Sequence, residues 1–445
     1  MAAKRVEGSP SSSLEPAGAE SASTSSTERS DKALLSSRGQ QNQHHQRRHQ
    51  GSSSSSDDAS SSSSSCFGRA FQSLSRRCEM TALAFLFGLP TGASEPILNC
   101  FYGKRTSEEG VELETKTQIV LQLGRLLSKE KNFNLVDLMR KDLARGRKWF
   151  ERLLRRPKHR DVRSEDVSFP AAPGVAAPNQ RWIGARIYTP KELADAGVPL
   201  PVLVYYHGGG WVIGNLNTVE GFLTHLCHWA KCVVVSVDYR LAPENPHPAA
   251  TEDALSSFRW VAESCAARGW DPARIAVGGD SAGGSISAAL CQRLLAEKAP
   301  VQPCLQVLLF PSVYLGPRNP AYKSIEEFGR DDFYTLPFKA MLYFRECYVG
   351  QSADGTDVGL SPVLAPDASL KGLPPAYFGL CHFDVLRDEG RDYARRLREN
   401  GVSVCVEEWR AHHGVTYLYG RMAYARECLK GVATHLRSQL YPSKL

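Results

Sequence analysis

A serine at the centre of a glycine-rich stretch has the surroundings of a nucleophile. Ser281 lies between Gly279 and Gly283, after the apolar run 275–277 and before a helix-like run that begins at residue 285. A serine in a sharp strand-to-helix turn has a strained backbone, and the residues two positions away must be small because strand and helix approach closely. Such a turn lifts the hydroxyl out of the sheet edge. The spacing therefore predicts a nucleophile; for this motif alone, a plain glycine-rich loop is the alternative.

A serine hydroxyl is a weak nucleophile near neutral pH, so it needs a base, usually a histidine that a carboxylate holds in place. On a parallel sheet with such a turn, the acid and then the histidine follow the serine along the chain, each after a strand. Asp384 comes shortly after the strand-like run 376–380, and His413 follows the next such run. Their order and placement predict a triad of Ser281, Asp384 and His413.

Other ionisable residues nearby compete for the same roles. Asp388 and Glu389 fall inside a helix-like run, so we expect them to face solvent or to support the loop. His382 lies two positions before the predicted acid and should point to the other side if the strand continues. His412 adjoins the predicted base, and the local chemistry does not separate these two histidines.

Three consecutive glycines after another apolar run predict a loop that binds negative charge. Residues 202–206 lead directly into the sequence His-Gly-Gly-Gly-Trp at 207–211. Glycines let the backbone approach a ligand and leave amide N–H groups free to point into a cleft. Such amides suit the oxyanion that develops when a carbonyl is attacked. A flexible glycine turn is the alternative, and the serine motif farther along the chain makes it the weaker one.

Strand-like and helix-like runs alternate between residues 166 and 440. The strand-like runs are 167–169, 183–188, 202–206, 233–237, 275–277, 305–310, 376–380 and 402–407; the helix-like runs are 219–230, 251–268, 285–297, 387–399 and 423–440. This alternation predicts an α/β fold with a mostly parallel, doubly wound sheet. Residues 166–445 are expected to form the catalytic domain.

Two helical regions should form a cap on this domain. Residues 66–165 carry apolar and charged residues at a helical period, which predicts an N-terminal cap region. Its helix-like runs are 78–89, 114–128 and 134–154. Residues 317–350 are helical and rich in aromatic side chains, so they are predicted to be a cap insertion that lines an acyl pocket, fills the cap core, or does both. Residues 1–65 are dense in serine, and we expect a disordered tail.

Positive charge is concentrated in residues 140–163. This segment has eleven Lys and Arg against three acids, a net charge of +8, whereas the whole chain carries +7. A basic amphipathic helix can make peripheral contact with an anionic membrane. The favoured alternative is an ordinary cap helix whose basic face is solvated. Binding to nucleic acid has no motif and no interleaved aromatic pattern to support it.

The remaining composition favours a cytoplasmic location. No apolar segment of the length of a signal peptide follows the N-terminus, and the run 80–89 is too short to span a bilayer. The twelve cysteines are scattered, several of them in strand-like runs, which favours buried free thiols in a reducing compartment. We expect no metal and no organic cofactor. The sequence does not indicate an oligomeric state.

Five motifs together closely resemble the hormone-sensitive-lipase family of carboxylesterases. They are His-Gly-Gly-Gly-Trp at 207–211, Asp-Tyr-Arg-Leu-Ala-Pro-Glu at 238–244, Gly-Asp-Ser-Ala-Gly-Gly at 279–284, Asp-Val-Leu-Arg-Asp-Glu-Gly at 384–390 and His-Gly at 413–414. The likeness covers about residues 166–440, in the family's order and spacing, and implies an α/β-hydrolase fold with a helical cap. Val385 and Val415 stand where the family usually has Pro and Phe, which leaves the triad intact.

The resemblance also implies roles for individual residues. The family histidine is followed by glycine, which makes His413 rather than His412 the base. The amides of Gly209, Gly210 and Ala282 are implied to form the oxyanion hole.

The implied activity is hydrolysis, through an acyl-enzyme, of a short- to medium-chain acyl ester or of an acetylated small molecule or lipid. An amide-cleaving deacetylase is an alternative. A non-catalytic receptor is another, because the plant gibberellin receptor resembles this family but has lost the catalytic histidine. The presence of His413 favours an enzyme.

Overall fold

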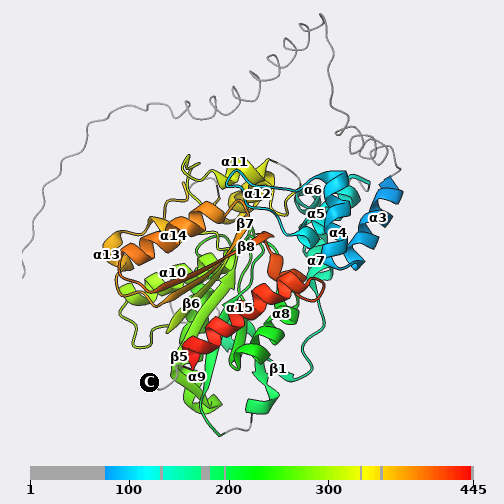
Figure 1. Cartoon of the computed structure of the whole chain (residues 1–445). Coiled ribbons are helices and arrows are strands. Elements are labelled where there is room, and N and C mark those ends of the chain that lie inside the picture. Colours follow the sequence, from blue (N-terminus) through cyan, green and yellow to red (C-terminus); the bar gives the residue numbers. More distant parts are fainter. Residues whose placement is uncertain are drawn as a thin grey trace, which may run out of the picture. The chain divides into compact units, whose positions relative to one another are not determined.

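The computed structural model describes residues 76–130, 134–171, 181–194, 197–330, 333–350 and 354–441. The tail predicted for residues 1–65 lies outside these ranges. Figure 1 shows the described helices and strands, coloured along the chain.

An eight-stranded sheet organises the described residues (Figure 1), in the order β1-β2-β4-β3-β5-β6-β7-β8. The strands are β1 (Val162–Pro170), β2 (Trp182–Pro190), β3 (Leu200–Tyr206), β4 (Val233–Asp238), β5 (Trp270–Asp280), β6 (Leu305–Leu309), β7 (Ala376–Phe383) and β8 (Val404–His412). Strand β2 runs antiparallel to β1 and to β4, and the other neighbouring pairs are parallel. The mostly parallel, doubly wound sheet predicted from the alternating runs is confirmed.

Successive side chains of a central strand enter different cores, because they point to opposite faces of the sheet. On β3, Val202, Val204 and Tyr206 pack in one core, and Leu203 and Tyr205 pack in the other. The first core includes residues of the helices α9 (Ala249–Arg268), α10 (Ala282–Ala296) and α14 (Arg387–Glu399); the second includes residues of α8 (Leu216–Ala230) and α15 (Ala423–Leu440). Helices on both faces explain why the central strands are apolar throughout.

Helices also precede the sheet. They are α3 (Arg76–Gly88), α4 (Thr91–Tyr102), α5 (Thr115–Glu130), α6 (Leu135–Lys141) and α7 (Leu143–Leu154). The first three share a small apolar core that includes Leu83, Leu98 and Ile119. The residue before α5 joins them to the sheet, because the amide of Glu114 donates to the carbonyl of Arg410 on β8 at 3.0 Å.

The prediction of one helix over 134–154 is wrong, because the chain is extended at Asp142 (φ −153°, ψ 90°). The carboxylate of Asp142 accepts a hydrogen bond from the amide of Arg145 and so caps the start of α7. The amide of Asp142 donates to the carbonyl of Leu138 and closes α6. An aspartate that bonds to nearby backbone competes with the helical hydrogen bonds, and here it divides one apolar pattern between two helices.

Helix α7 is attached to the sheet domain by Arg147. Its Nε donates to the carbonyl of Val212 at 2.8 Å, and its Nη2 donates to the carbonyl of Ala242 at 2.9 Å. The same guanidinium forms a bidentate salt bridge with the carboxylate of Glu244, and both N–O distances are 2.8 Å. Because Val212 directly follows the predicted glycine loop, this arginine connects α7 to that loop.

The segment 317–350 contains α11 (Ser324–Gly329) and α12 (Phe338–Val349). The ring of Tyr348 stacks on Trp211, with centroids 4.6 Å apart and planes 3° apart. The ring of Phe344 lies directly against Gly210. The aromatic residues of α12 therefore pack on the glycine loop. The shorter elements are η1 (Lys191–Leu193), η2 (Pro362–Leu364), α13 (Asp367–Leu370) and η3 (Val415–Leu418).

The cysteines with described side chains are free thiols, and Cys232 and Cys381 are buried. Burial raises the pKa of the Cys232 thiol to about 12, so it stays protonated and unreactive. Among the helices of the described ranges, we find none with the length and apolar character to cross a membrane.

Replacing Arg147 with Gln should weaken the attachment of α7. The carbonyls of Val212 and Ala242 would lose their donor, so the free energy of unfolding should fall by roughly 1 to 2 kcal/mol in a urea titration. Lys148→Gln is the matched control, because it removes the same charge from an exposed side chain of the same helix. Equal losses in the two variants would contradict a specific role for the Arg147 contacts.

Candidate active site

Ser281 lies in a strained turn between β5 and α10. Its φ of 54° and ψ of −120° are rare for a residue with a side chain. A Cβ atom on Gly279 would lie 2.3 Å from the carbonyl carbon of Gly283, and one on Gly283 would lie 1.9 Å from the carbonyl oxygen of Tyr206. The close approach expected from the glycine spacing is therefore present, and only glycine fits at either position.

The three residues predicted as a triad meet at one edge of the sheet. His413 Nε2 lies 3.0 Å from Ser281 Oγ, and His413 Nδ1 lies 2.7 Å from Asp384 Oδ2. The other carboxylate oxygen of Asp384 accepts from the amide of Leu386 at 3.0 Å. With Nδ1–H donating to the carboxylate, the lone pair of Nε2 is left to accept the serine proton.

Strand register explains why the acid and the histidine meet. Strands β7 and β8 are parallel neighbours, and Phe383 pairs with His412 at their carboxyl ends. The next residues along each strand are Asp384 and His413, so they leave the sheet side by side. The ring of His413 also packs edge-on against Phe310, with centroids 4.9 Å apart.

The structure separates the two adjacent histidines. His412 Nδ1 lies 2.6 Å from the carbonyl oxygen of His413 and 3.0 Å from Thr335 Oγ1. Burial lowers the pKa of His412 to about 4, so its imidazole is neutral at pH 7. His412 therefore supports the loop that carries His413, whereas only His413 contacts Ser281.

The other candidates also make separate contacts. His382 Nε2 bonds to Ser107 Oγ at 2.8 Å, and its Nδ1 bonds to Glu408. Asp388 accepts from the amide of Ser324 at 2.8 Å. None of these contacts involves the triad.

Exposure to solvent was one of the two outcomes expected for Glu389, but its side chain is buried. Its buried carboxylate accepts from the amides of Val313 and Tyr314 at 2.8 and 3.3 Å. Those amides follow β6 and need an acceptor, so Glu389 supports the loop after β6 rather than the loop that carries Asp384. Burial raises the pKa of Glu389 well above its usual range.

The glycine loop has the geometry of an anion-binding turn. Gly209 and Gly210 have φ of 122° and 59°, and a Cβ atom on Gly209 would lie 2.1 Å from the carbonyl oxygen of Ile213. Within the described residues, the amides of Gly209, Gly210 and Ala282 donate to no backbone carbonyl. Ala282 begins α10, where the helix dipole is positive. These amides are available as donors to an oxyanion.

The buried carboxylate of Asp280, which was not among the predicted site residues, connects β3, the glycine loop and η3. Asp280 Oδ1 accepts from the hydroxyl of Tyr205 at 2.8 Å and from the amide of Gly208 at 3.0 Å. Its Oδ2 accepts from the hydroxyl of Tyr417 at 2.7 Å. Burial raises the pKa of Asp280, while these hydrogen bonds favour its charged form. The sequence does carry a signal for this role, namely an acidic residue beside Ser281 at the end of an apolar strand. A buried acid in such a place must have hydrogen-bond partners.

One group of side chains in the described part of the chain has donor atoms spaced as metal ligands would be. His159, Asp161 and His228 each place one such atom within 4.8 Å of the others. The two imidazoles are stacked, with centroids 4.1 Å apart and planes 19° apart. Lone pairs of nearly parallel stacked rings do not converge on one ion, so this arrangement is ring packing rather than a formed zinc site. The lack of a cofactor stays a prediction.

Comparison with known proteins gives the family. A family model described as an alpha/beta hydrolase fold matches residues 203–417. Carboxylic ester hydrolase LipN of Mycobacterium tuberculosis is 39% identical over 282 residues, which are 61% of this chain and 71% of that protein. Ethyl acetate hydrolase of Pseudomonas putida is 35% identical over 237 residues, 53% of this chain and 71% of that protein. The chain belongs to the hormone-sensitive-lipase family of esterases.

Solved esterase structures agree with this family. An ester-hydrolase from the metagenome of Lake Arreo has a TM-score of 0.64 at 33% identity, over 72% of this chain and 97% of that chain. A hyperthermophilic esterase from Pyrobaculum calidifontis has a TM-score of 0.61 at 32% identity, over the same shares. The resemblance drawn from the five motifs and the α/β-hydrolase fold are both confirmed. The family match extends from β3 to η3 and includes Ser281, Asp384 and His413.

The two histidines should differ in kinetics. His413→Ala should lower kcat on a soluble ester by at least about a thousandfold, because nucleophile and base act as one unit. His412→Ala removes only loop contacts and should lower kcat by less than about tenfold. Steady-state rates of the two purified variants measure the difference. A larger loss of kcat in His412→Ala than in His413→Ala would show that His412, and not His413, is the base.

Asp280 should act as a positioning residue, and Tyr417→Phe tests this with little change in volume. Loss of one hydrogen bond to Asp280 should displace the loop after His413 and lower kcat roughly ten- to a hundredfold with KM little changed. Tyr206→Phe is the matched control, because the Tyr206 hydroxyl is also buried but bonds to the carbonyl of Ala254. Wild-type kcat in Tyr417→Phe would contradict the positioning role.

Proposed function

We propose that this esterase cleaves carboxylic esters through a covalent acyl-enzyme on Ser281. The observation that carries the proposal is the unbroken chain of contacts from Ser281 Oγ through both ring nitrogens of His413 to Asp384. Nucleophile, base and carboxylate have the mutual distances that the serine hydrolase mechanism needs.

In the first half of the reaction, His413 Nε2 takes the proton of Ser281 as Oγ attacks the ester carbonyl. The carbonyl oxygen becomes an oxyanion, which the amides of Gly209, Gly210 and Ala282 stabilise. Asp384 holds the ring in place and stabilises the imidazolium. His413 then gives the proton to the leaving alcohol oxygen as the ester C–O bond breaks.

In the second half, a water molecule takes the place of the alcohol. His413 removes a proton from the water, whose oxygen attacks the acyl carbon, and the same amides stabilise the second oxyanion. The bond to Oγ breaks, Oγ regains the proton from His413, and the carboxylic acid leaves. The cycle consumes one water and needs no other reactant.

The proposed substrate is a short- to medium-chain acyl ester of a small molecule or lipid. The ring of Phe344 against Gly210 supports an acyl site walled by an aromatic side chain beside the oxyanion loop. A relative named ethyl acetate hydrolase supports the short end of this range. The named relatives are esterases, which does not favour the receptor or the amide-cleaving deacetylase.

We also propose the domain organisation, with a cap formed by the N-terminal helices and by α11 and α12. The helices α3 to α7 fall within residues 66–165, and α11 and α12 fall within 317–350. The boundary of the catalytic domain moves slightly, because β1 begins at Val162 rather than after residue 165.

We also propose that the basic segment forms cap helices rather than a surface that binds an anionic membrane. Two cations of the basic segment are engaged within the chain, since Arg140 pairs with Glu346 at 3.0 Å and Arg147 with Glu244. This engagement supports α6 and α7 as cap helices.

The proposal is tested by Ser281→Ala with a series of nitrophenyl esters from acetate to dodecanoate. Wild-type kcat/KM should be highest for short and medium chains, and Ser281→Ala should lose at least about a thousandfold on each ester. Unchanged circular dichroism would show that the variant folds. An optimum on the longest chain would contradict the substrate class, whereas wild-type rates in Ser281→Ala would contradict the mechanism.

A further inference from the structure

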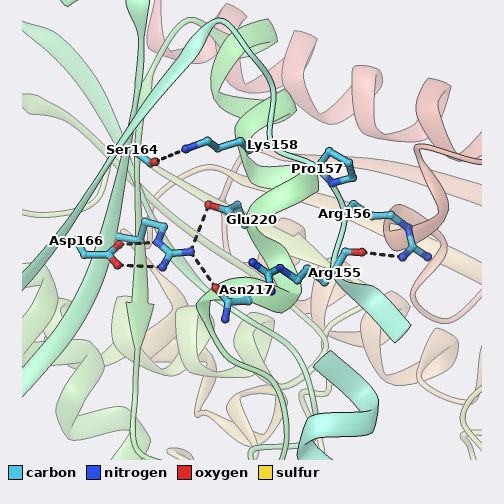
Figure 2. A pocket seen from close by; sticks show the side chains of 9 residues that line it. Arg155, Arg156, Pro157, Lys158, Ser164, Asp166, Asn217 and Glu220 are labelled. Atoms are coloured by element: carbon cyan, nitrogen blue, oxygen red, sulfur yellow. Dashed lines mark hydrogen bonds and ion pairs between the residues drawn. The ribbon is translucent and has the colours of Figure 1, made fainter. Parts of the chain in front are cut away.

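A cavity of about 810 Å³ lies between the loop that follows α7, the first two strands and the start of α8 (Figure 2). Arg155, Arg156 and Lys158 line it from the loop. Ser164 and Asp166 of β1, Arg186 of β2, and Asn217 and Glu220 of α8 complete its wall. None of the triad residues lines this cavity, so it is distinct from the esterase site.

The acidic side chains of the cavity are already held by one arginine. Arg186 forms a bidentate salt bridge with Asp166, with N–O distances of 2.5 and 2.9 Å. Its Nη1 donates to Asn217 Oδ1 at 3.0 Å and to Glu220 Oε1 at 3.3 Å. Both carboxylates therefore have a cationic partner, and all three nitrogens of the Arg186 guanidinium donate hydrogen bonds.

The cations of the loop have no such partners. Lys158 Nζ donates to the neutral hydroxyl of Ser164 at 3.0 Å (Figure 2). Arg156 Nη1 donates to the carbonyls of Leu153 and Arg155, both at 2.8 Å. Within the described residues, no carboxylate lies within ion-pair distance of Arg155, Arg156 or Lys158. With Arg186, Asp166 and Glu220 included, the lining has a formal net charge of +2.

The guanidinium of Arg156 lies in surroundings that oppose its positive charge. Its Nε is buried without a partner among the described residues. Burial, and then the charge of Arg421, lower the pKa of Arg156. Figure 2 shows the side chain of Arg156 directed away from Asn217 and that of Arg155 directed toward it. Arg155 and Lys158 are therefore the cations presented to a ligand.

We propose that this cavity binds the phosphate group of a small phosphorylated molecule, with Arg155, Lys158 and the hydroxyl of Ser164 as its ligands. A phosphomonoester carries close to two negative charges at pH 7, and Arg155 and Lys158 together offer two positive charges. A guanidinium donates two parallel hydrogen bonds to phosphate, and an ammonium binds it as a point charge. The volume exceeds that of phosphate alone, so the organic part of the molecule has room.

The position of the cavity predicts an effect on the cap. Glu151 of α7 accepts from Asn215 Nδ2 and Asn217 Nδ2, both at 2.9 Å, so α7 and the start of α8 share one polar contact. The cations of the cavity lie on the loop that leads from α7 to β1. A bound phosphate would join this loop to the sheet and stabilise the attachment of the cap.

The test is titration calorimetry of the full chain with inorganic phosphate and with pyrophosphate, at constant ionic strength. Wild type should bind pyrophosphate saturably with a Kd of about 1 mM or lower. The double variant Arg155→Gln, Lys158→Gln should bind at least tenfold more weakly. Arg160→Gln is the matched control, because Arg160 lies in the same loop and is 92% exposed but does not line the cavity. It should bind as wild type does.

Wild-type esterase activity in the double variant would show that it is folded, so that its loss of binding is specific. Absence of saturable binding by wild type would overturn the proposal, and so would equal weakening in Arg160→Gln. Sedimentation with phosphatidylcholine vesicles that contain phosphatidic acid distinguishes the source of the phosphate. Sedimentation that the double variant loses and Arg160→Gln keeps would assign the site to a lipid headgroup, whereas pyrophosphate binding without sedimentation would assign it to a free phosphorylated molecule.

Discussion

The site depends on a constraint at the carboxyl ends of the parallel strands, where three loops must meet within hydrogen-bond distance. Asp280 helps to meet it, because its single carboxylate bonds to β3, to the glycine loop and to η3. A buried charge is costly unless its hydrogen bonds are made, and here the donors come from β3, the glycine loop and the element that follows His413. Stability of the core and geometry of the site thus rest on the same contacts.

The proposed cap is connected to the same loops. Arg147 bonds to the carbonyl of Val212, just after the glycine loop, while Tyr348 stacks on Trp211 within it. Thr335, between α11 and α12, bonds to the carbonyl of His413 at 2.8 Å. Both parts of the proposed cap therefore contact the glycine loop or the loop that carries His413, so a change in these helices can alter the candidate site without contacting its three side chains.

Much of the fold and of the site is predictable from sequence because local spacing determines it. The glycines around Ser281 leave one possible turn, and the order of Asp384 and His413 follows from strands whose ends lie side by side. The same local reasoning failed at Asp142, where apolar periodicity continues but a side-chain cap ends the helix.

Contacts between distant segments could not be predicted in this way. Two of the three partners of Asp280 are Gly208 and Tyr417, which lie 72 and 137 residues away along the chain, and those of Glu389 lie after β6. No local pattern marks such pairs. The rule that a buried acid must have donors indicates that partners exist, and only the three-dimensional arrangement identifies them.

We propose Ser281 as the nucleophile of an acyl-transfer reaction, and the other assignments in the site depend on it. The most direct measurement is labelling of the full chain with a fluorophosphonate, followed by mass spectrometry of the digested protein. We expect one phosphonyl group per chain, on the peptide that contains Ser281, and loss of esterase activity in proportion to labelling. A label on another residue, or full activity after complete labelling, would contradict it.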